Sequence, residues 1–357
     1  MRRAFASSIV AGLLLVGCAD TVATVAQKPS STTTTTEPEV TPSGALGGYQ
    51  PVSDVGEHAK ISADLCEIEG RLGATPPDFA AARAIYRDGK NSAEGEGKRT
   101  LGKFALEGRS SENTLGRYER YLGPAWLDVF VDGALTGAGA FAGEAPAVRR
   151  VTAEIGMRDQ IVVAWALHEL DAAAEKAKNG SWVKKTGAPH NWDEVWAYYH
   201  GVMPECGPYA TADARGKDFG KGTASNEAIL SAIQKGLEAM KAKKAGDVSK
   251  ARDEVFRQVT ITYIRSVIRA AHAVDAAFAQ GKADEARLWQ AEGWASFRVI
   301  EPLVAGVHTT AARAVAGVFD LAAKPAPGSA AKVTVALSSA YGTLHIAPAD
   351  IGEYHPA

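Results

Sequence analysis

Cysteine is scarce in this chain: only three occur among the 357 residues, namely Cys18, Cys66 and Cys206. The separation of Cys66 from Cys206 matches no zinc-finger spacing, and two thiols alone do not indicate a metal centre. An exported protein can form a disulfide, so the pairing of Cys66 with Cys206 is left open at this point.

An excess of positive charge is also missing. The sequence has 39 Lys and Arg residues against 41 Asp and Glu residues, which gives a net charge of −2. Nucleic-acid-binding domains usually carry a basic stripe, so we expect no nucleic-acid partner. Beyond the N-terminal segment, no apolar run is long and charge-free enough to span a bilayer.

Several motifs of enzymes and cofactor proteins are absent. The chain contains no Glu-x-x-His, no Gly-x-Ser-x-Gly and no Cys-x-x-Cys-His. These absences argue against a ferritin-like di-iron oxidase, an α/β-hydrolase and a covalently attached haem. The glycine-rich stretch 133–143 lacks Gly-x-Gly-x-x-Gly spacing, so we expect a turn between helices there. We therefore do not expect an enzyme.

The first residues have the pattern of a targeting segment. Arg2 and Arg3 precede a short apolar core, and Leu15-Val16-Gly17-Cys18 resembles a bacterial lipobox. We expect residues 1–17 to be a lipoprotein signal peptide and Cys18 to be lipidated, which would anchor the protein to a bacterial membrane outside the cytoplasm. An ordinary cleaved signal peptide is the alternative. The Thr- and Pro-rich residues 18–47 predict a disordered linker, and residues 48–357 form the folded domain.

The folded domain has a helical pattern. From about residue 60 to 320, alanine is frequent and apolar residues recur at helical spacing. Asp78 and Asn191 are expected to cap helices, and the segment KVTVAL after Pro325 is expected to form a short strand. The predicted fold class is all-α.

Two parts of this pattern are similar to each other. Long helices are expected at 151–178 and 253–280. Within this region VTAEIGMRDQIVVAWALHELDAAAEKAKNG (151–180) aligns with VTITYIRSVIRAAHAVDAAFAQG (259–281), and WDEVWAYYHGVMP aligns with LWQAEGWASFRVIEP further along. The alignment predicts a pseudo-symmetric bundle built from a duplicated hairpin of a long and a short helix, with repeats at about 126–215 and 226–320.

Each long helix carries His-x-x-Asp: His168 and Asp171 in the first, His272 and Asp275 in the second. Residues three apart share a helix face, and both pairs continue an apolar stripe towards the bundle interior. A buried carboxylate requires a partner. Three interpretations remain open here: a polar network that fixes helix register, a metal site, and acid–base catalysis.

Further polar residues favour the metal interpretation. Glu194 and Glu292 occupy matched positions on the short helices, and Tyr198 follows Glu194 on the same face. Nitrogen and oxygen ligands without thiolate suit a hard or borderline ion, and a phenolate beside carboxylates favours ferric iron over zinc.

Five stretches of the chain resemble the low-iron-inducible periplasmic protein family, an iron-assimilating family of green algae with bacterial members. They are DFAAARAIYRDGKNS, WLDVFVDGALTGAGAFAG, NWDEVWAYYHG, GPYATADARG and EGWASFRVIEPLVA. The resemblance implies an extracytoplasmic protein that is induced by iron scarcity and assists iron uptake. His-x-x-Asp is also similar to the His-x-x-Glu motif of imelysin-like periplasmic iron proteins, which are likewise duplicated helical bundles.

These observations lead to one hypothesis and one rival. The hypothesis is a lipid-anchored iron-binding protein that holds ferric or ferrous iron, or another divalent metal, between the repeats and passes it to a transporter or reductase. The expected ligands are His168, Asp171, Glu194, His272, Asp275, Glu292 and Tyr198. The rival is a structural or interaction lipoprotein in which the His/Asp pairs are buried networks without metal.

Overall fold

The computed structural model describes residues 41–106 and 113–356. The chain divides into two units, Met1–Glu37 and Pro38–Ala357, and the first unit lies outside the described residues. The predicted signal peptide, the lipidation site Cys18 and most of the predicted linker therefore also lie outside them.

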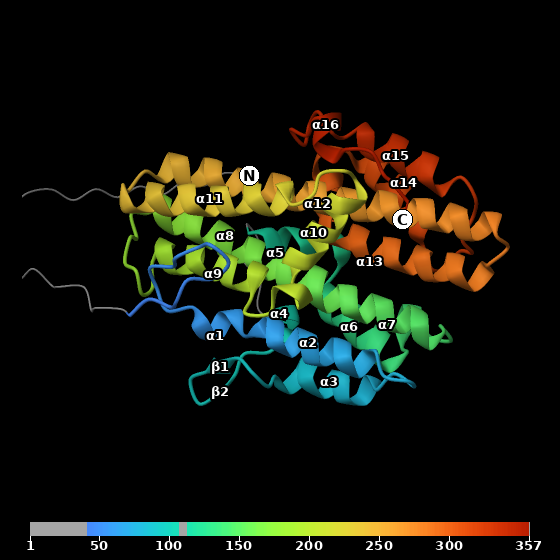
Figure 1. Ribbon diagram of the computed structural model, residues 1–357, viewed down its shortest axis with the longest axis horizontal. Helices are drawn as coiled ribbons and strands as arrows, with labels where there is room; N and C mark the ends of the chain where they lie inside the picture. The colour runs from blue at the N-terminus through green and yellow to red at the C-terminus, as the bar shows by residue number, and fades with distance from the viewer. Residues whose placement is uncertain (1–40, 107–112, 357) are drawn as a thin grey trace, which may run out of the picture. The chain divides into compact units, whose positions relative to one another are not determined.

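The described unit is all-α, as predicted from the sequence (Figure 1). Its α-helices are α1 (Gly56–Ala59), α2 (Ile61–Leu72), α3 (Phe79–Asp88), α4 (Leu101–Leu106), α5 (Thr114–Leu122), α6 (Trp126–Thr136), α7 (Pro146–Ile155), α8 (Val162–Lys178), α9 (Ala188–His200), α10 (Pro208–Asp218), α11 (Ala224–Lys241), α12 (Ala245–Ala279), α13 (Ala283–Val307), α14 (Thr309–Phe319), α15 (Ser329–Ser338) and α16 (Pro348–Ile351). Two 3₁₀ turns, η1 (Gly139–Phe141) and η3 (Pro204–Cys206), and a π-helical turn, η2 (Gly156–Ile161), complete the helical segments.

The only sheet among the described residues is a two-stranded antiparallel hairpin, β1 (Ala93–Glu94) and β2 (Gly97–Lys98). Its register pairs Ala93 with Lys98 and Glu94 with Gly97. The backbone N–H of Ala93 donates to the Glu57 carboxylate at 2.7 Å, which holds the hairpin against α1.

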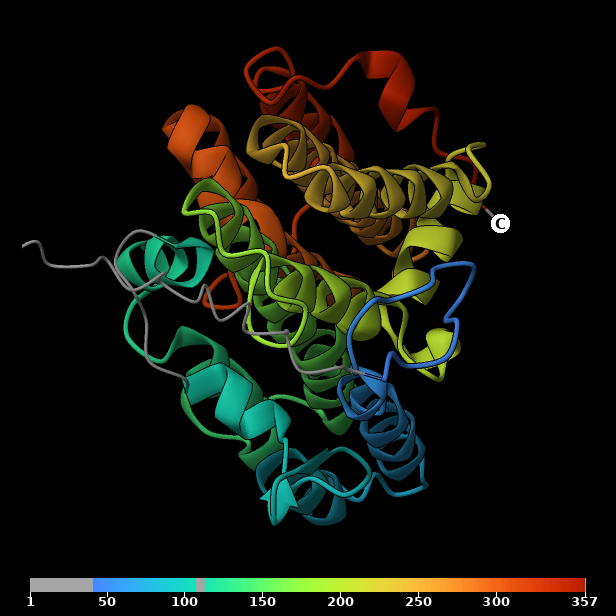
Figure 2. The ribbon, with the colours of Figure 1, turned by 90° about the vertical axis from the view of Figure 1, so that its left-hand side faces the viewer.

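Most of the long helices pack against a helix that is next to them in the chain and runs in the opposite direction. Helix α8 packs against α9, and α12 packs against both α11 and α13. The C-terminal helices α14 and α15 cover α12 and α13 on the side opposite to α2 and α3 (Figures 1 and 2). None of the described helices combines the length and apolar character needed to cross a membrane.

Local sequence features explain most helix ends. The Asp78 side chain accepts the backbone N–H of Ala81 at 3.0 Å and caps α3, as predicted. Helix α6 ends at Gly137, whose φ of 73° lies in the left-handed region that glycine adopts without strain.

Two local predictions were wrong. The segment KVTVAL lies within helix α15, and its surroundings are rich in alanine. Val333 and Leu337 are four residues apart, so in a helix they lie on one face, which is buried. Asn191 does not cap α9, which begins three residues earlier after Gly187. Its side chain instead donates to Glu169 at 2.5 Å and accepts from Lys176 at 2.7 Å.

Candidate metal centre

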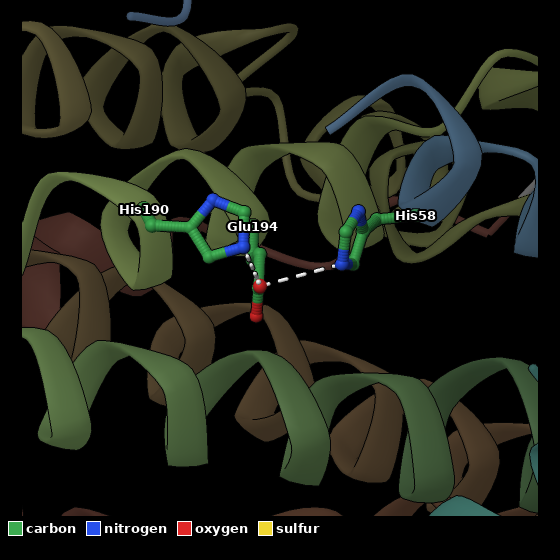
Figure 3. A group of neighbouring side chains, drawn as sticks. All are labelled: His58, His190 and Glu194. Atoms are coloured by element: carbon green, nitrogen blue, oxygen red, sulfur yellow. Dashed lines mark ion pairs between the residues drawn. The ribbon is translucent and has the colours of Figure 1, made fainter. Parts of the chain in front are cut away.

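Three side chains from two helices meet around one carboxylate oxygen. Nε2 of His190 lies 2.9 Å from Oε1 of Glu194, and Nε2 of His58 lies 3.3 Å from the same oxygen (Figure 3). All three ligand atoms lie within 4.8 Å of one another. Among the described residues, no other group of three or more His, Cys, Asp and Glu side chains satisfies this geometry.

Helix α9 supplies two of the three residues. His190 and Glu194 are four residues apart, so they lie on one face of the helix one turn apart. The helix is held from behind by Trp192, whose indole N–H donates to the Ile233 carbonyl at 2.8 Å. Gly236 on α11 leaves room for that indole, since a Cβ atom there would lie 1.9 Å from Trp192 Cζ2.

His58 reaches the site from α1 because the chain after α9 is bound to the chain around α1 and α2. The backbone N–H of Val202 donates to the Ala59 carbonyl at 3.0 Å, and the N–H of Met203 donates to Ser62 Oγ at 3.0 Å. The structure also joins Cys66 and Cys206 in a disulfide, with a Cα–Cα distance of 5.2 Å. These links place His58 opposite the His190 face of α9.

A cavity of about 220 Å³ opens beside the three residues. The residues that line it include Phe104, Trp165, Glu169 and Tyr198, and the Phe104 and Trp165 rings are stacked at a centroid distance of 4.4 Å. Glu169 on α8 is 6% exposed, so the cavity contains a second buried carboxyl group near Glu194. The charged side chains of Glu94, Arg99 and Lys103 also line the cavity.

The two buried carboxyl groups have opposite tendencies to ionise. Burial disfavours the charged form of Glu194, but hydrogen bonds from His190 and His58 together lower its pKa far below the usual range. Burial raises the pKa of Glu169, and the neighbouring Glu194 carboxylate raises it further. Glu194 is therefore the member of the pair that ionises more readily, and Glu169 is the member that holds its proton more tightly.

Burial also raises the pKa of Tyr198, and the charge of Glu194 acts in the same direction. Tyr198 is consequently a neutral phenol in the metal-free protein. It becomes a phenolate ligand only if a bound cation displaces its proton.

The donor set suits a transition-metal ion with open coordination positions. Two imidazoles and one carboxylate on one side of an ion form the set that non-haem ferrous sites use. Glu169 and Tyr198 line the same cavity and supply two further oxygen atoms. The arrangement can bind an ion and leave room for an additional ligand.

The structure brings only two of the seven sequence-predicted ligands to this site, Glu194 and Tyr198. Glu292 lies elsewhere, where it accepts from Arg269 at 2.7 Å and has Arg215 at 3.9 Å. The predicted convergence of all seven residues between the repeats is therefore not observed.

The aspartates of the two His-x-x-Asp pairs bind the first residues of other helices. Asp171 accepts the backbone N–H of Thr114, the first residue of α5, at 3.0 Å, and His168 Nδ1 lies 3.2 Å from the Asn113 side chain. Asp275 accepts the N–H groups of Ser329 and Ala330 at 2.9 and 3.0 Å, at the start of α15. Carboxylates at these positions satisfy unpaired N–H groups and interact favourably with the helix dipole.

The expected burial of His272 was wrong. Its side chain is exposed to solvent and contacts the Tyr354 ring at a centroid distance of 4.9 Å. The apolar stripe of α12 continues towards Asp275, but His272 lies at the edge of the face that packs against other helices.

The sequence reasoning did not identify His58, His190 or Glu169. His190-x-x-x-Glu194 has the spacing that places two ligands on one helix face, so a search for that spacing would have found it. Glu169 stands beside His168 in the sequence but on another face of α8, where it is buried. No local pattern indicates His58, because its position depends on contacts between distant segments.

Comparison with known proteins gives one match. The family model described as low iron-inducible periplasmic protein matches residues 22–356, which is most of the chain. No curated protein and no solved structure matches the sequence.

Proposed function

The chain belongs to the low iron-inducible periplasmic protein family, and we propose that it is an extracytoplasmic iron-binding protein whose ion is held by His58, His190 and Glu194. The observation that supports this site is the meeting of two imidazole nitrogens at one carboxylate oxygen, at 2.9 and 3.3 Å. The family name supports the choice of iron over other ions that accept the same ligands.

In this proposal, Glu169 provides a fourth ligand once it loses its proton, and Tyr198 provides a fifth when the ion is ferric. Hard oxygen ligands of this kind favour ferric over ferrous iron, whereas the imidazoles bind both. The role is binding and release, without catalysis. Capture outside the cytoplasm followed by transfer to an iron transporter or reductase is the function that this site supports best.

Two predictions from the sequence are retained here as part of the proposal. Cys18 carries a lipid that anchors the protein to a bacterial membrane, so that the folded domain operates at the membrane surface. The hairpins α8–α9 and α12–α13 derive from a duplication, which is supported by the similar use of Asp171 and Asp275 at the first turns of α5 and α15.

The test is a metal titration of the purified, metal-stripped protein. Anaerobic calorimetry with ferrous iron, and separate titrations with zinc and manganese, measure affinity and stoichiometry. We expect one site, and we expect Glu194→Gln to reduce the affinity by at least about 100-fold, since the variant loses the carboxylate that both imidazoles contact. Glu292→Gln is the matched control, because it removes another partly buried carboxylate, which lies outside the site.

The rival function is a structural lipoprotein in which His58, His190 and Glu194 form only a hydrogen-bonded network. This alternative is supported by the fact that both imidazoles already contact the Glu194 carboxylate. A wild-type protein that binds none of the three metals, and whose melting temperature does not rise when they are added, would establish the rival.

A further inference from the structure

A second cavity, of about 550 Å³, lies at α6 and α13, and none of the three proposed iron ligands lines it. The glycine-rich stretch 133–143, which the sequence predicted as a turn between helices, supplies part of its lining. Gly133 allows Phe141 to pack closely against α6, since a Cβ atom at position 133 would lie 3.3 Å from Phe141 Cδ2. The glycine-rich stretch therefore does more than connect two helices, because it brings an aromatic ring to the cavity.

Three aromatic rings in this lining contact one another. The centroid of the Phe130 ring lies 4.9 Å from that of Trp294 and 5.3 Å from that of Phe141. The Phe141 and Trp294 centroids are 5.6 Å apart. Aromatic rings at such distances interact favourably through their faces and edges, so the cluster can accept a further ring from a ligand.

Arg298 lines the same cavity and has poor partners for its guanidinium group. Its Nε is buried and donates to no residue that the structure describes. Glu301, the only carboxylate within 4 Å of it among the described residues, lies 3.8 Å from Nη1, which is beyond hydrogen-bond distance. The side chain is nevertheless only 20% exposed, and its Cζ lies 5.7 Å from the Trp294 ring centroid. Unpaired donors at a largely buried position are costly, so this group favours an additional acceptor.

The acidic side chains in the lining already have cationic partners. Asp128 pairs with Arg87 at 2.6 Å, and Asp132 pairs with Arg83 at 2.7 Å. Arg298 is the only Lys or Arg side chain in the lining. An anion that enters the cavity therefore meets acids whose charges are balanced and one arginine without a close acceptor.

We propose that this cavity binds a small aromatic carboxylate. The carboxylate group accepts hydrogen bonds from Arg298, because a planar guanidinium matches a carboxylate in shape and charge. The aromatic body packs against the rings of Phe130, Phe141 and Trp294. A cavity of this volume, with aromatic walls and few polar anchors, is typical of sites for small organic ligands. The site requires no iron, so the inference does not depend on the proposed function.

The experiment is a calorimetric titration of the purified, metal-stripped protein with three aromatic acids: benzoate, 2-naphthoate and indole-3-acetate. Indole-3-acetamide serves as the neutral analogue, and hexanoate serves as a carboxylate without a ring. We expect at least one aromatic acid to bind at a single site. If indole-3-acetate binds, the amide should bind at least about tenfold more weakly, because it lacks the charge that pairs with the guanidinium. Hexanoate that binds as tightly as the best aromatic acid would overturn the assignment to an aromatic ligand.

Variants of Arg298 test the role of the guanidinium. Arg298→Gln should reduce the affinity for the aromatic acid by at least about tenfold, and Arg298→Lys should restore part of the loss, since it keeps the charge but not the planar fork. Arg71→Gln, which removes an exposed arginine on α2, is the matched control and should behave like the wild type. Melting temperatures establish that each variant is folded.

Ala140→Trp tests the cavity without removing the guanidinium. Ala140 lines the cavity and is exposed, so an indole at this position would fill part of the space without disturbing the core. We expect this variant to lose binding of the aromatic acid, whereas Val335→Trp, at an exposed position on α15, should retain it. Iron affinity should not change in either variant.

Two results would overturn the inference. One is the absence of binding of all three aromatic acids to the wild type. The other is wild-type affinity for the aromatic acid in Ala140→Trp or in Arg298→Gln. Both results would leave the proposed function intact, because the iron titration is a separate measurement on residues that do not line this cavity.

Discussion

Ser53 donates both its backbone N–H and its hydroxyl group to Oδ2 of Asp193, at 2.8 and 2.7 Å. Asp193 is the residue before Glu194 on α9, and its other oxygen accepts from the hydroxyl group of Tyr49 at 2.5 Å. The buried carboxylate thereby fixes the segment that leads into α1 and His58. The carboxylates of two neighbouring residues thus have different roles: Asp193 positions the chain, and Glu194 faces the candidate ion.

Asp193→Asn should lower both stability and metal affinity. The amide places a donor where Asp193 now accepts, so buried donors of the 49–53 segment lose their partner, at a cost of roughly 2–4 kcal/mol in the free energy of unfolding. Urea denaturation and iron titration measure the two effects. Ser53→Ala is the milder comparison, with a loss of about 1 kcal/mol and little change in affinity. Equal affinities of Asp193→Asn and the wild type would show that this segment does not position His58.

The Cys66–Cys206 disulfide closes a loop with a sequence separation of 140 residues. A loop of that size stabilises the folded state by up to about 5 kcal/mol through the entropy of the unfolded chain. The double variant Cys66→Ala/Cys206→Ala should therefore unfold at a lower urea concentration, and iron affinity should fall because α2 and η3 are no longer joined. A reductant should reproduce the effect in the wild type and leave the variant unchanged; an equal response of both proteins would contradict the prediction.

The sequence predicted the helices well because their apolar periodicity is local information. The long helices expected at 151–178 and 253–280 follow from patterns within one segment. The first is divided into α7, η2 and α8 in the structure, and α12 begins at Ala245, several residues before the expected start at residue 253. KVTVAL was misjudged for the same reason, since β-branched residues in a short window favour a strand until the tertiary contacts of α15 are known.

The candidate site was harder to predict because it depends on long-range contacts. Glu194 and Tyr198 were identified from their shared face on α9, but His58 comes from a segment more than 130 residues earlier, which is brought there by Ser62, Asp193 and the disulfide. The alignment of the two hairpins also led the prediction to treat Glu292 like Glu194. Their surroundings differ, because arginines surround Glu292 and histidines surround Glu194.

Iron affinity should increase with pH in the range where Glu169 is protonated in the metal-free protein. Burial and the charge of Glu194 raise the pKa of Glu169, so an ion that coordinates Glu169 must displace a proton. The number of protons released can be obtained from calorimetry in buffers with different ionisation enthalpies. Glu169→Gln should release fewer protons and show a flatter dependence of affinity on pH. Identical proton release by the variant would exclude Glu169 as a ligand.

Stability should depend on pH through Glu69, which is outside the metal site. Burial raises the pKa of Glu69 to about 7, although Arg158 lies 3.1 Å away and opposes the shift. Because this folded-state pKa exceeds the unfolded value of 4.5, the folded protein binds the proton more tightly. The charged form therefore destabilises the fold above about pH 7, and this penalty disappears as the pH falls towards 4.5.

Glu69→Gln should consequently raise the free energy of unfolding at about pH 8, by up to about 3 kcal/mol, and the gain should shrink towards about pH 5. The control is Glu67→Gln on the same helix, where hydrogen bonds from Asn91 and Lys90 lower the pKa of the carboxyl group. That variant should lose a little stability at the higher pH. Urea denaturation at the two pH values measures both variants, and a gain in Glu67→Gln as large as that in Glu69→Gln would refute the assignment.

Asp171 and Asp275 provide the test that separates the sequence-based site from the structural one. Each carboxylate accepts the backbone N–H of the first residue of another helix, Thr114 in α5 and Ser329 in α15. In this role the two residues stabilise helix ends, and neither contacts the His58–His190–Glu194 group. Asp171→Asn and Asp275→Asn should each cost about 1–2 kcal/mol in the free energy of unfolding, since an amide oxygen still accepts one N–H but carries no charge to complement the helix dipole.

Iron affinity should be unchanged in both variants, and the number of ions bound should remain one. The stability losses should also add in the double variant, because the two carboxylates act on different helices. If either substitution lowered iron affinity as strongly as Glu194→Gln does, the ion would have to lie between the two hairpins, as the His-x-x-Asp spacing first indicated. Affinity that depends on Glu194 and is indifferent to Asp171 and Asp275 would instead mean that the repeated His-x-x-Asp motif was retained for joining helices, and that iron binding arose at one end of a single hairpin through its contact with the N-terminal segment.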